Sequence, residues 1–128
     1  MFLEETPEQQ SFRKEVREYF AGLMTDDIRE GLRGAHETSP IRRQLFSQMG
    51  KDGMLGVGWP KEYGGQEGEG VYEYILNEAL AGRGGPQIGK GVGIIGKTLI
   101  AHGSEILKEE FLPKILANEV EFAIGYSE

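Results

Sequence analysis

The sequence of 128 residues has the length of one ordinary domain, which can bury a hydrophobic core without disulfides or metals. It contains no cysteine, so a disulfide framework, a thiolate metal site and a cysteine nucleophile are all excluded. The net charge of −7 disfavours binding to nucleic acid or to an anionic membrane surface.

The N-terminus lacks the pattern of a secretory signal, because it carries the acidic residues Glu4 and Glu5 where a signal is basic. No stretch approaches the roughly 18 apolar residues that a membrane-spanning helix needs. We therefore predict a cytoplasmic protein without a membrane span. Its 20 glycines are about twice the usual share of ~7% and indicate turns or close approaches of the backbone.

Two helices are predicted in the first third of the chain. Residues 6–9 combine a threonine N-cap, a proline at the first helical position and a glutamine that can complete a capping box. The apolar residues that follow recur at helical spacing and form one stripe: Phe12, Val16, Tyr19, Phe20 and Leu23. Thr25 is placed to cap a second, short helix that carries Ile28 and Leu32.

Two further helices are predicted on either side of a structured loop. Residues 39–40 repeat the pattern of a cap followed by proline, so Ser39 is expected to cap the third helix. Residues 55–65 have no helical period, and we expect Trp59 and Tyr63 to anchor them as a loop. Helical spacing returns over residues 71–80 and ends at a second cluster of glycines.

A glycine-rich helix is predicted over residues 87–101, where Val92, Ile95 and Leu99 recur at helical spacing. Four glycines lie inside it, each at a cost of about 1 kcal/mol relative to alanine: Gly89, Gly91, Gly93 and Gly96. Two explanations are open. Either another element packs closely against these glycines, or the missing side chains widen a cavity for a ligand.

The last predicted helix follows Ser104 as its N-cap, carries apolar residues from Ile106 to Leu116, and is kinked or divided by Pro113. It is expected to end near Asn118, because asparagine suits a left-handed cap. No strand pattern appears before Val120. The sequence therefore predicts an all-α fold, a bundle of five to six helices over residues 1–119, followed by a β-prone segment at 120–128.

Motifs that carry chemistry are weak. Residues 91–96 match the G-x-G-x-x-G spacing of a dinucleotide site, but no hydrophobic strand precedes them, so we do not predict such a site. His36 and His102 lie far apart in sequence and lack metal-binding spacing. No G-x-S-x-G motif occurs. No catalytic residue and no metal ligand are assigned.

Four segments, in order, resemble the acyl-CoA dehydrogenase family: Trp59-Pro60-Lys61-Glu62-Tyr63-Gly64-Gly65, Ala101-His102-Gly103-Ser104-Glu105, Phe111 to Glu119, and Phe122 to Glu128. The similarity covers essentially the whole chain and corresponds to the helical N-terminal domain of that family. Residues 120–128 then resemble the start of its flavin-binding β-domain, where the family continues with Pro-x-Ala-Gly-Ser-Asp. We expect the sequence to be cut at that junction.

The resemblance implies an FAD-dependent enzyme that introduces an α,β double bond into an acyl-CoA thioester. A carboxylate removes the α-proton, the β-hydride passes to FAD, and the electrons leave through an electron-transferring flavoprotein. The substrates of similar enzymes include bulky acyl-CoAs such as steroid side-chain thioesters. The resemblance places the base beyond residue 128, so this piece alone is expected to be inactive, and it implies a homo- or hetero-oligomer.

Site residues follow from the resemblance, position by position. The cofactor-binding candidates are Gly125, Tyr126, Ser127 and Glu128, and the substrate-binding candidates are Gln87, Gly91 and Ile94. The alternative is a non-catalytic helical interaction module, or a non-catalytic subunit of a hetero-oligomeric dehydrogenase. Residues that follow position 128 in the gene would discriminate between the two.

Overall fold

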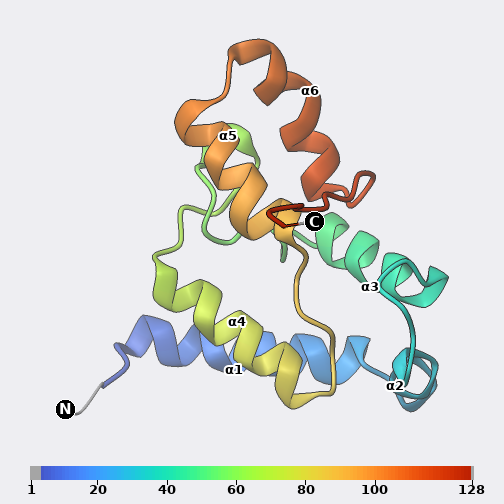
Figure 1. Ribbon diagram of the computed structural model, residues 1–128. Coiled ribbons are helices and arrows are strands. Elements are labelled where there is room, and N and C mark those ends of the chain that lie inside the picture. The colour runs from blue at the N-terminus through green and yellow to red at the C-terminus, as the bar shows by residue number, and fades with distance from the viewer. Residues whose placement is uncertain (1–3, 128) are drawn as a thin grey trace. The chain divides into compact units, whose positions relative to one another are not determined.

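The computed structural model describes residues 4–127, and in that range the fold is all-α, with six α-helices and no strand (Figure 1). This confirms the predicted fold class. The chain divides into two compact units. Unit 1 runs to Arg42 and resumes over Gly68–Gln87, and unit 2 comprises Arg43–Glu67 and the chain from Ile88 onward.

Unit 1 contains the helices α1 (Pro7–Leu23), α2 (Asp26–Leu32) and α4 (Gly70–Gly82). The predicted capping box is present: the Thr6 hydroxyl accepts from the Gln9 amide at 3.2 Å, and the Gln9 side chain accepts from the Thr6 amide at 2.9 Å. These bonds satisfy amides that the helix itself leaves without partners.

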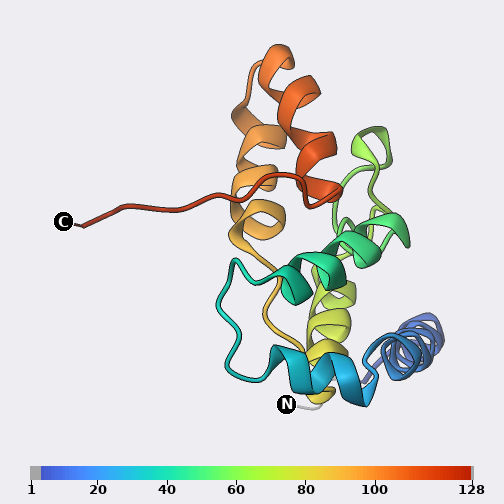
Figure 2. The same cartoon turned by 90° about the vertical axis from the view of Figure 1, so that its right-hand side faces the viewer.

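Helices α1 and α4 lie side by side and form the core of unit 1 (Figures 1 and 2). Val16 and Phe20 of the predicted stripe are fully buried. Their counterparts on α4 are Ile75, Leu76, Ala79 and Leu80. Arg13 links the two helices, because it pairs with Glu5 and, at 3.2 Å, with the Glu78 carboxylate.

Unit 2 contains most of α3 (Pro40–Lys51), a 3₁₀ turn at Lys61–Tyr63, α5 (Gly96–His102) and α6 (Glu105–Leu116). Pro113 lies inside α6 without dividing it. Trp59, Leu112 and Ile115 form its buried centre. Partly buried apolar side chains surround them: Tyr63, Val92, Ile95, Leu99, Ile100, Phe111, Leu116, Val120 and Phe122.

Helix ends confirm predicted caps, among them Ser104 and Asn118, and correct one. The Ser104 hydroxyl accepts from the Leu107 amide at 3.3 Å, and Asn118 adopts the left-handed conformation, with φ 55°. The predicted cap at Ser39 is wrong, although α3 does begin at Pro40. The Ser39 hydroxyl is shielded from solvent and has no hydrogen-bond partner among residues 4–127.

The glycine-rich helix also begins later than predicted. Residues 85–89 have no regular structure, and the helix starts at Lys90 with a π-helical turn over Gly91–Ile95 before α5. Within residues 4–127, no helix is both long and apolar enough to cross a bilayer.

Candidate functional site

The π-helical turn at Gly91–Ile95 is the most irregular backbone of the glycine-rich segment. The Gly96 amide donates to the Gly91 carbonyl, five residues back, where an α-helix would use the residue four back. The Trp59 indole N–H donates to the Val92 carbonyl at 3.0 Å. The Thr98 hydroxyl donates to the Ile94 carbonyl at 2.8 Å. Single π-helical turns of this kind occur frequently at functional sites.

The four glycines of this segment do not share one explanation. A Cβ atom on Gly96 would lie 2.1 Å from Cζ2 of Trp59, so close packing requires glycine there. A Cβ on Gly91 would make ordinary contacts of 3.5 Å with Ile115 and Phe122. Cβ atoms on Gly89 and Gly93 would meet no described atom within 4 Å. Packing within the described chain therefore explains Gly96 and leaves Gly89 and Gly93 unexplained.

The predicted substrate-binding residues occupy different surroundings. Gln87 is exposed in unit 1, and its carbonyl accepts from an Arg42 guanidinium nitrogen at 3.1 Å. Gly91 and Ile94 belong to unit 2, where Gly91 faces α6 and Ile94 remains 48% exposed. The role of these three residues in binding substrate stays a prediction.

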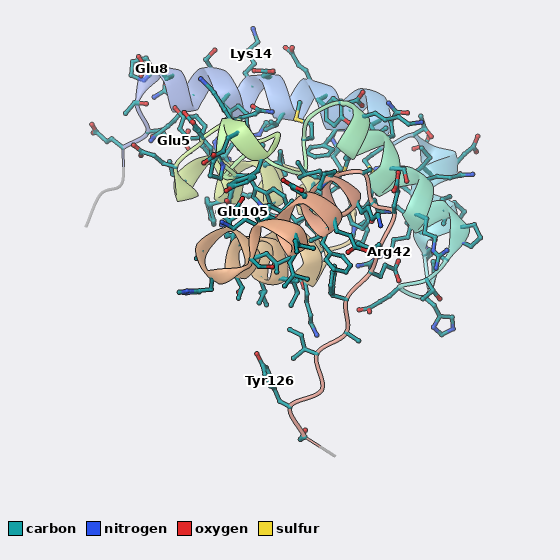
Figure 3. The ribbon with its side chains drawn as sticks, turned by 90° about the horizontal axis from the view of Figure 1, so that it is seen from above. Glu5, Glu8, Lys14, Arg42, Glu105 and Tyr126 are labelled. Carbon is teal, nitrogen blue, oxygen red and sulfur yellow. The ribbon has the colours of Figure 1, made fainter. Side chains whose placement is uncertain are left out.

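The predicted cofactor-binding residues lie on the extended tail that follows α6. The tail is fastened upstream, where the Phe122 ring meets the Phe111 ring edge-to-face at 6.0 Å. Beyond that contact Gly125 and Ser127 are exposed, and Tyr126 is 92% exposed on the extended tail (Figure 3). Glu128 lies outside the described residues.

The chemistry of these tail residues fits one edge of a flavin. Exposed backbone amides and the Ser127 hydroxyl can donate hydrogen bonds to the nitrogen and oxygen atoms of an isoalloxazine ring. The described residues add no further wall around Gly125, since a Cβ there would meet none of their atoms within 4 Å. The cofactor role of the tail therefore stays a prediction.

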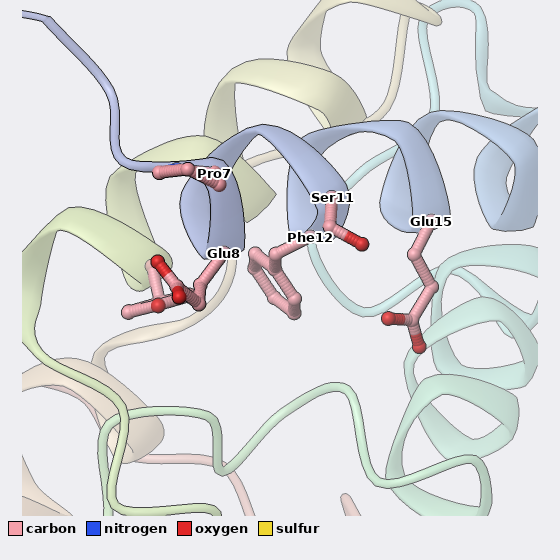
Figure 4. Close-up of a pocket in the computed structure, with 6 residues that line it drawn as sticks. Pro7, Glu8, Ser11, Phe12 and Glu15 are labelled. Atoms are coloured by element: carbon pink, nitrogen blue, oxygen red, sulfur yellow. The ribbon is translucent and has the colours of Figure 1, made fainter.

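A shallow hollow of about 530 Å³ lies on unit 1 and is lined in part by the aromatic pair Phe12 and Tyr72. Phe12 lies between Glu8 and Glu15, which also line the hollow (Figure 4). The two rings pack edge-to-face with their centroids 5.1 Å apart. Sequence patterns did not reveal this hollow, because Tyr72 comes from α4, far along the chain. Residues 4–127 contain no group of three or more side chains able to hold a metal ion.

The fold, the loop around Trp59 and the glycine-rich helix together define one family of helical domains. A family profile, Acyl-CoA dehydrogenase, N-terminal domain, matches residues 6–119, and the chain belongs to this family. The chain is 40% identical over 126 residues to acyl-CoA dehydrogenase FadE26 of Mycobacterium tuberculosis, covering 96% of this chain and 32% of the relative. It is 41% identical to FadE29 of the same organism, covering 100% of this chain and 33% of the relative.

Solved structures give the same result. The chain matches a subunit of the ChsE4-ChsE5 complex of Mycobacterium tuberculosis with a TM-score of 0.87 and 40% identity, covering 100% of this chain and 32% of that one. It matches the Tcur3481-Tcur3483 steroid ACAD with a TM-score of 0.89 and 38% identity, covering 100% of this chain and 33% of that one. The chain thus spans about a third of the length of the relatives that it matches.

Proposed function

We propose that this chain is the N-terminal helical part of an FAD-dependent acyl-CoA dehydrogenase that acts on a bulky acyl-CoA, such as a steroid side-chain thioester. The observation that carries the proposal is similarity along the whole chain, at 38% identity, to a structure named as a steroid ACAD. Identity of 40% to FadE26 and 41% to FadE29 supports the dehydrogenase class.

In this proposal the residues of this chain bind and position the flavin and the acyl thioester, and none of them transfers a proton. A bound flavin supplies the capacity to accept the hydride from the β-carbon of the thioester. The Ser127 hydroxyl and the backbone amides of Gly125 and Tyr126 would hold one edge of the flavin ring. The open positions Gly89 and Gly93 would leave room for the acyl group, and the exposed Ile94 would offer it apolar contact. The base would come from residues outside this chain.

The direct test uses the complete gene product. We expect it to purify with bound flavin and to reduce an artificial electron acceptor when given an acyl-CoA that carries a ring system. Electron transfer to an electron-transferring flavoprotein should follow. A product that has no flavin and does not oxidise any acyl-CoA, alone or with a partner subunit, would contradict the proposal.

The role of Ser127 has its own test. Ser127→Ala removes one hydrogen bond, so we expect flavin affinity to fall by about 2- to 10-fold, corresponding to about 0.5 to 1.5 kcal/mol. Ser11→Ala is a matched control, because Ser11 is an exposed serine on α1. Equal flavin affinity and spectra in both variants would reject the assigned role.

Two leucine substitutions separate a widened cavity from close packing. Gly93→Leu adds a side chain where no described atom lies within 4 Å of the new Cβ, so it should leave stability intact and reduce turnover of bulky acyl-CoAs relative to short ones. Gly91→Leu extends toward Ile115 and Phe122, so it should lower the free energy of unfolding by about 1 to 3 kcal/mol. Any loss of turnover should then be the same for bulky and short acyl-CoAs. If Gly93→Leu leaves the ratio of the two kcat/KM values unchanged, Gly93 does not line the acyl cavity.

A second candidate is a non-catalytic subunit of a hetero-oligomeric dehydrogenase. The observation in its favour is that both matched structures are named for two components, ChsE4 with ChsE5 and Tcur3481 with Tcur3483. Co-expression with a second acyl-CoA dehydrogenase subunit from the same genome tests it. An active stoichiometric complex in which Ser127→Ala changes neither flavin affinity nor turnover would favour this candidate.

A further inference from the structure

Trp59, on the loop that precedes the 3₁₀ turn, contacts the glycine-rich turn in two ways. The indole N–H donates to the Val92 carbonyl at 3.0 Å, and the ring lies where a Cβ of Gly96 would stand. We propose that Trp59 is a positioning residue, whose indole holds residues 91–95 in the π-helical register and so fixes where Gly93 and Ile94 face the acyl group. This inference rests on the proposed function.

The hydrogen bond acts on the atom that distinguishes the two registers. In an α-helix, the Gly96 amide would donate to the Val92 carbonyl, four residues back. In this structure the Gly96 amide donates to the Gly91 carbonyl instead, and the Val92 carbonyl accepts from Trp59. The indole therefore bonds to the acceptor that the α-helical register would use.

The absence of a side chain at Gly96 supports the same π-helical arrangement. A Cβ at this position would lie 2.1 Å from the Trp59 ring and 2.9 Å from the Gly91 carbonyl oxygen. The indole and the π-helical hydrogen bond both need a residue without a side chain there. One glycine thus serves both contacts.

Trp59 is suited to this role because its own position is fixed. The side chain is completely buried. Its backbone amide donates to the Gly56 carbonyl at 3.1 Å, and its carbonyl accepts from the Glu67 amide at 2.8 Å. The loop that carries the tryptophan is therefore a rigid support, against which the start of the helix is held.

A change of register would move the residues that face outward. Converting the π-helical turn to an α-helical one removes one residue from that turn and rotates the residues before it by about 100° around the helix axis. Gly93 is open and Ile94 is 48% exposed, so both belong to the surface that would turn. A bulky acyl group would then meet different atoms.

The test uses the complete gene product with Trp59 replaced by 3-benzothienylalanine, which keeps the bicyclic shape and lacks the N–H. Trp59→Phe is a second variant, and Ile75→Val is a control that lowers stability by a change in the core of unit 1. We expect amide exchange at Ile95 and Gly96 to rise by about 2- to 10-fold in both Trp59 variants, as loss of one hydrogen bond implies, and to stay unchanged in the control.

The second measurement is the preference between a ring-bearing and a short acyl-CoA. We expect the Trp59 variants to raise KM for the bulky substrate more than for the short one, with kcat largely retained, while Ile75→Val alters neither. Unchanged amide exchange would overturn the claim that Trp59 keeps residues 91–95 in the π-helical register. Faster exchange with unchanged substrate preference would overturn the positioning role and leave Trp59 a stabilising residue only.

The outcomes for the Trp59 variants can be distinguished from a failure of the proposed function. If the unmodified gene product neither oxidises nor binds acyl-CoA by calorimetry, the proposed function is refuted, and the part of the inference that concerns the acyl group falls with it. The exchange measurement requires no substrate. It would still confirm or refute that Trp59 stabilises the π-helical turn.

Discussion

Unit 1 and unit 2 are built by different means. Unit 1 consists of regular helices, in which α1 and α4 bury apolar stripes against each other. Unit 2 depends on irregular backbone, namely the loop around Trp59 and the π-helical turn that the indole contacts. Regular elements follow from neighbouring residues, whereas irregular ones follow from contacts between distant residues.

This difference matters for function, because the site candidates in unit 2 lie on the irregular part. Gly93 and Ile94 belong to the π-helical turn. Unusual backbone of this kind persists where surrounding structure holds it in place, and it occurs often at functional sites. The comparison therefore predicts that substitutions around Trp59 affect function, while equivalent losses in unit 1 affect stability alone.

The largest expected effect comes from truncating the fully buried aromatic residue of each unit. Trp59→Ala and Phe20→Ala should each lower the free energy of unfolding by about 3 to 5 kcal/mol, since both side chains are completely buried. Trp59→Ala should lie at the upper end, because the Val92 carbonyl also loses its donor. Urea denaturation measures both losses.

Hydrogen exchange sharpens this comparison. Trp59→Ala should accelerate exchange at Ile95 and Gly96, and Phe20→Ala should act mainly on the amides of α1 and α4. If Phe20→Ala loosens the π-helical turn as much as Trp59→Ala does, the two regions are not held independently, and the comparison between them fails.

Next in size is a pair of glycine substitutions with opposite signs. Gly96→Ala should destabilise by about 1 to 3 kcal/mol, because the new Cβ would lie 2.1 Å from the rigid Trp59 ring. Gly22→Ala in α1 should stabilise by about 0.5 to 1 kcal/mol, since no described atom lies within 4 Å of the new Cβ and alanine favours a helix. Melting temperatures that shift in the same direction would contradict this assignment.

The sequence predicted those parts of the fold that depend on near neighbours. The capping box of Thr6 and Gln9, the cap at Ser104 and the left-handed Asn118 all involve residues within a few positions of one another. The stripe on α1 follows from the period of the helix alone. For such features the local sequence contains the necessary information.

The features that the sequence missed depend on tertiary contacts. The bond from Trp59 to Val92 joins residues 33 positions apart, and no local pattern indicates it. The composition did single out the glycine-rich segment, but only the structure separates the packed Gly96 from the open Gly89 and Gly93. The cofactor residues on the tail came from family resemblance alone.

A smaller effect is expected at two of the predicted N-caps, Thr6 and Ser39. Thr6→Ala should cost about 1 kcal/mol, within the range of about 0.5 to 2 for lost caps, because the hydroxyl accepts from the Gln9 amide. Ser39→Ala should change stability by only a few tenths of a kcal/mol or slightly increase it, since the shielded hydroxyl has no partner among residues 4–127. Thermal denaturation of both variants checks the contrast. An equal loss in Ser39→Ala would mean that its hydroxyl does cap α3.

The smallest expected effect is a pH dependence in unit 1. The hydrogen bond from Arg13 holds the pKa of Glu5 below its ordinary value of 4.5. Because the pKa is lower in the folded state, the charged carboxylate stabilises the fold above the ordinary value, and this contribution is lost as the pH falls through the lowered value. Between about pH 6 and about pH 3, the melting temperature of the unmodified chain should therefore fall slightly more than that of Glu5→Gln. Glu37→Gln removes one negative charge from an exposed turn and serves as the control. If both variants flatten the acid dependence equally, net charge causes the effect, and the pairing of Glu5 with Arg13 adds nothing measurable to stability.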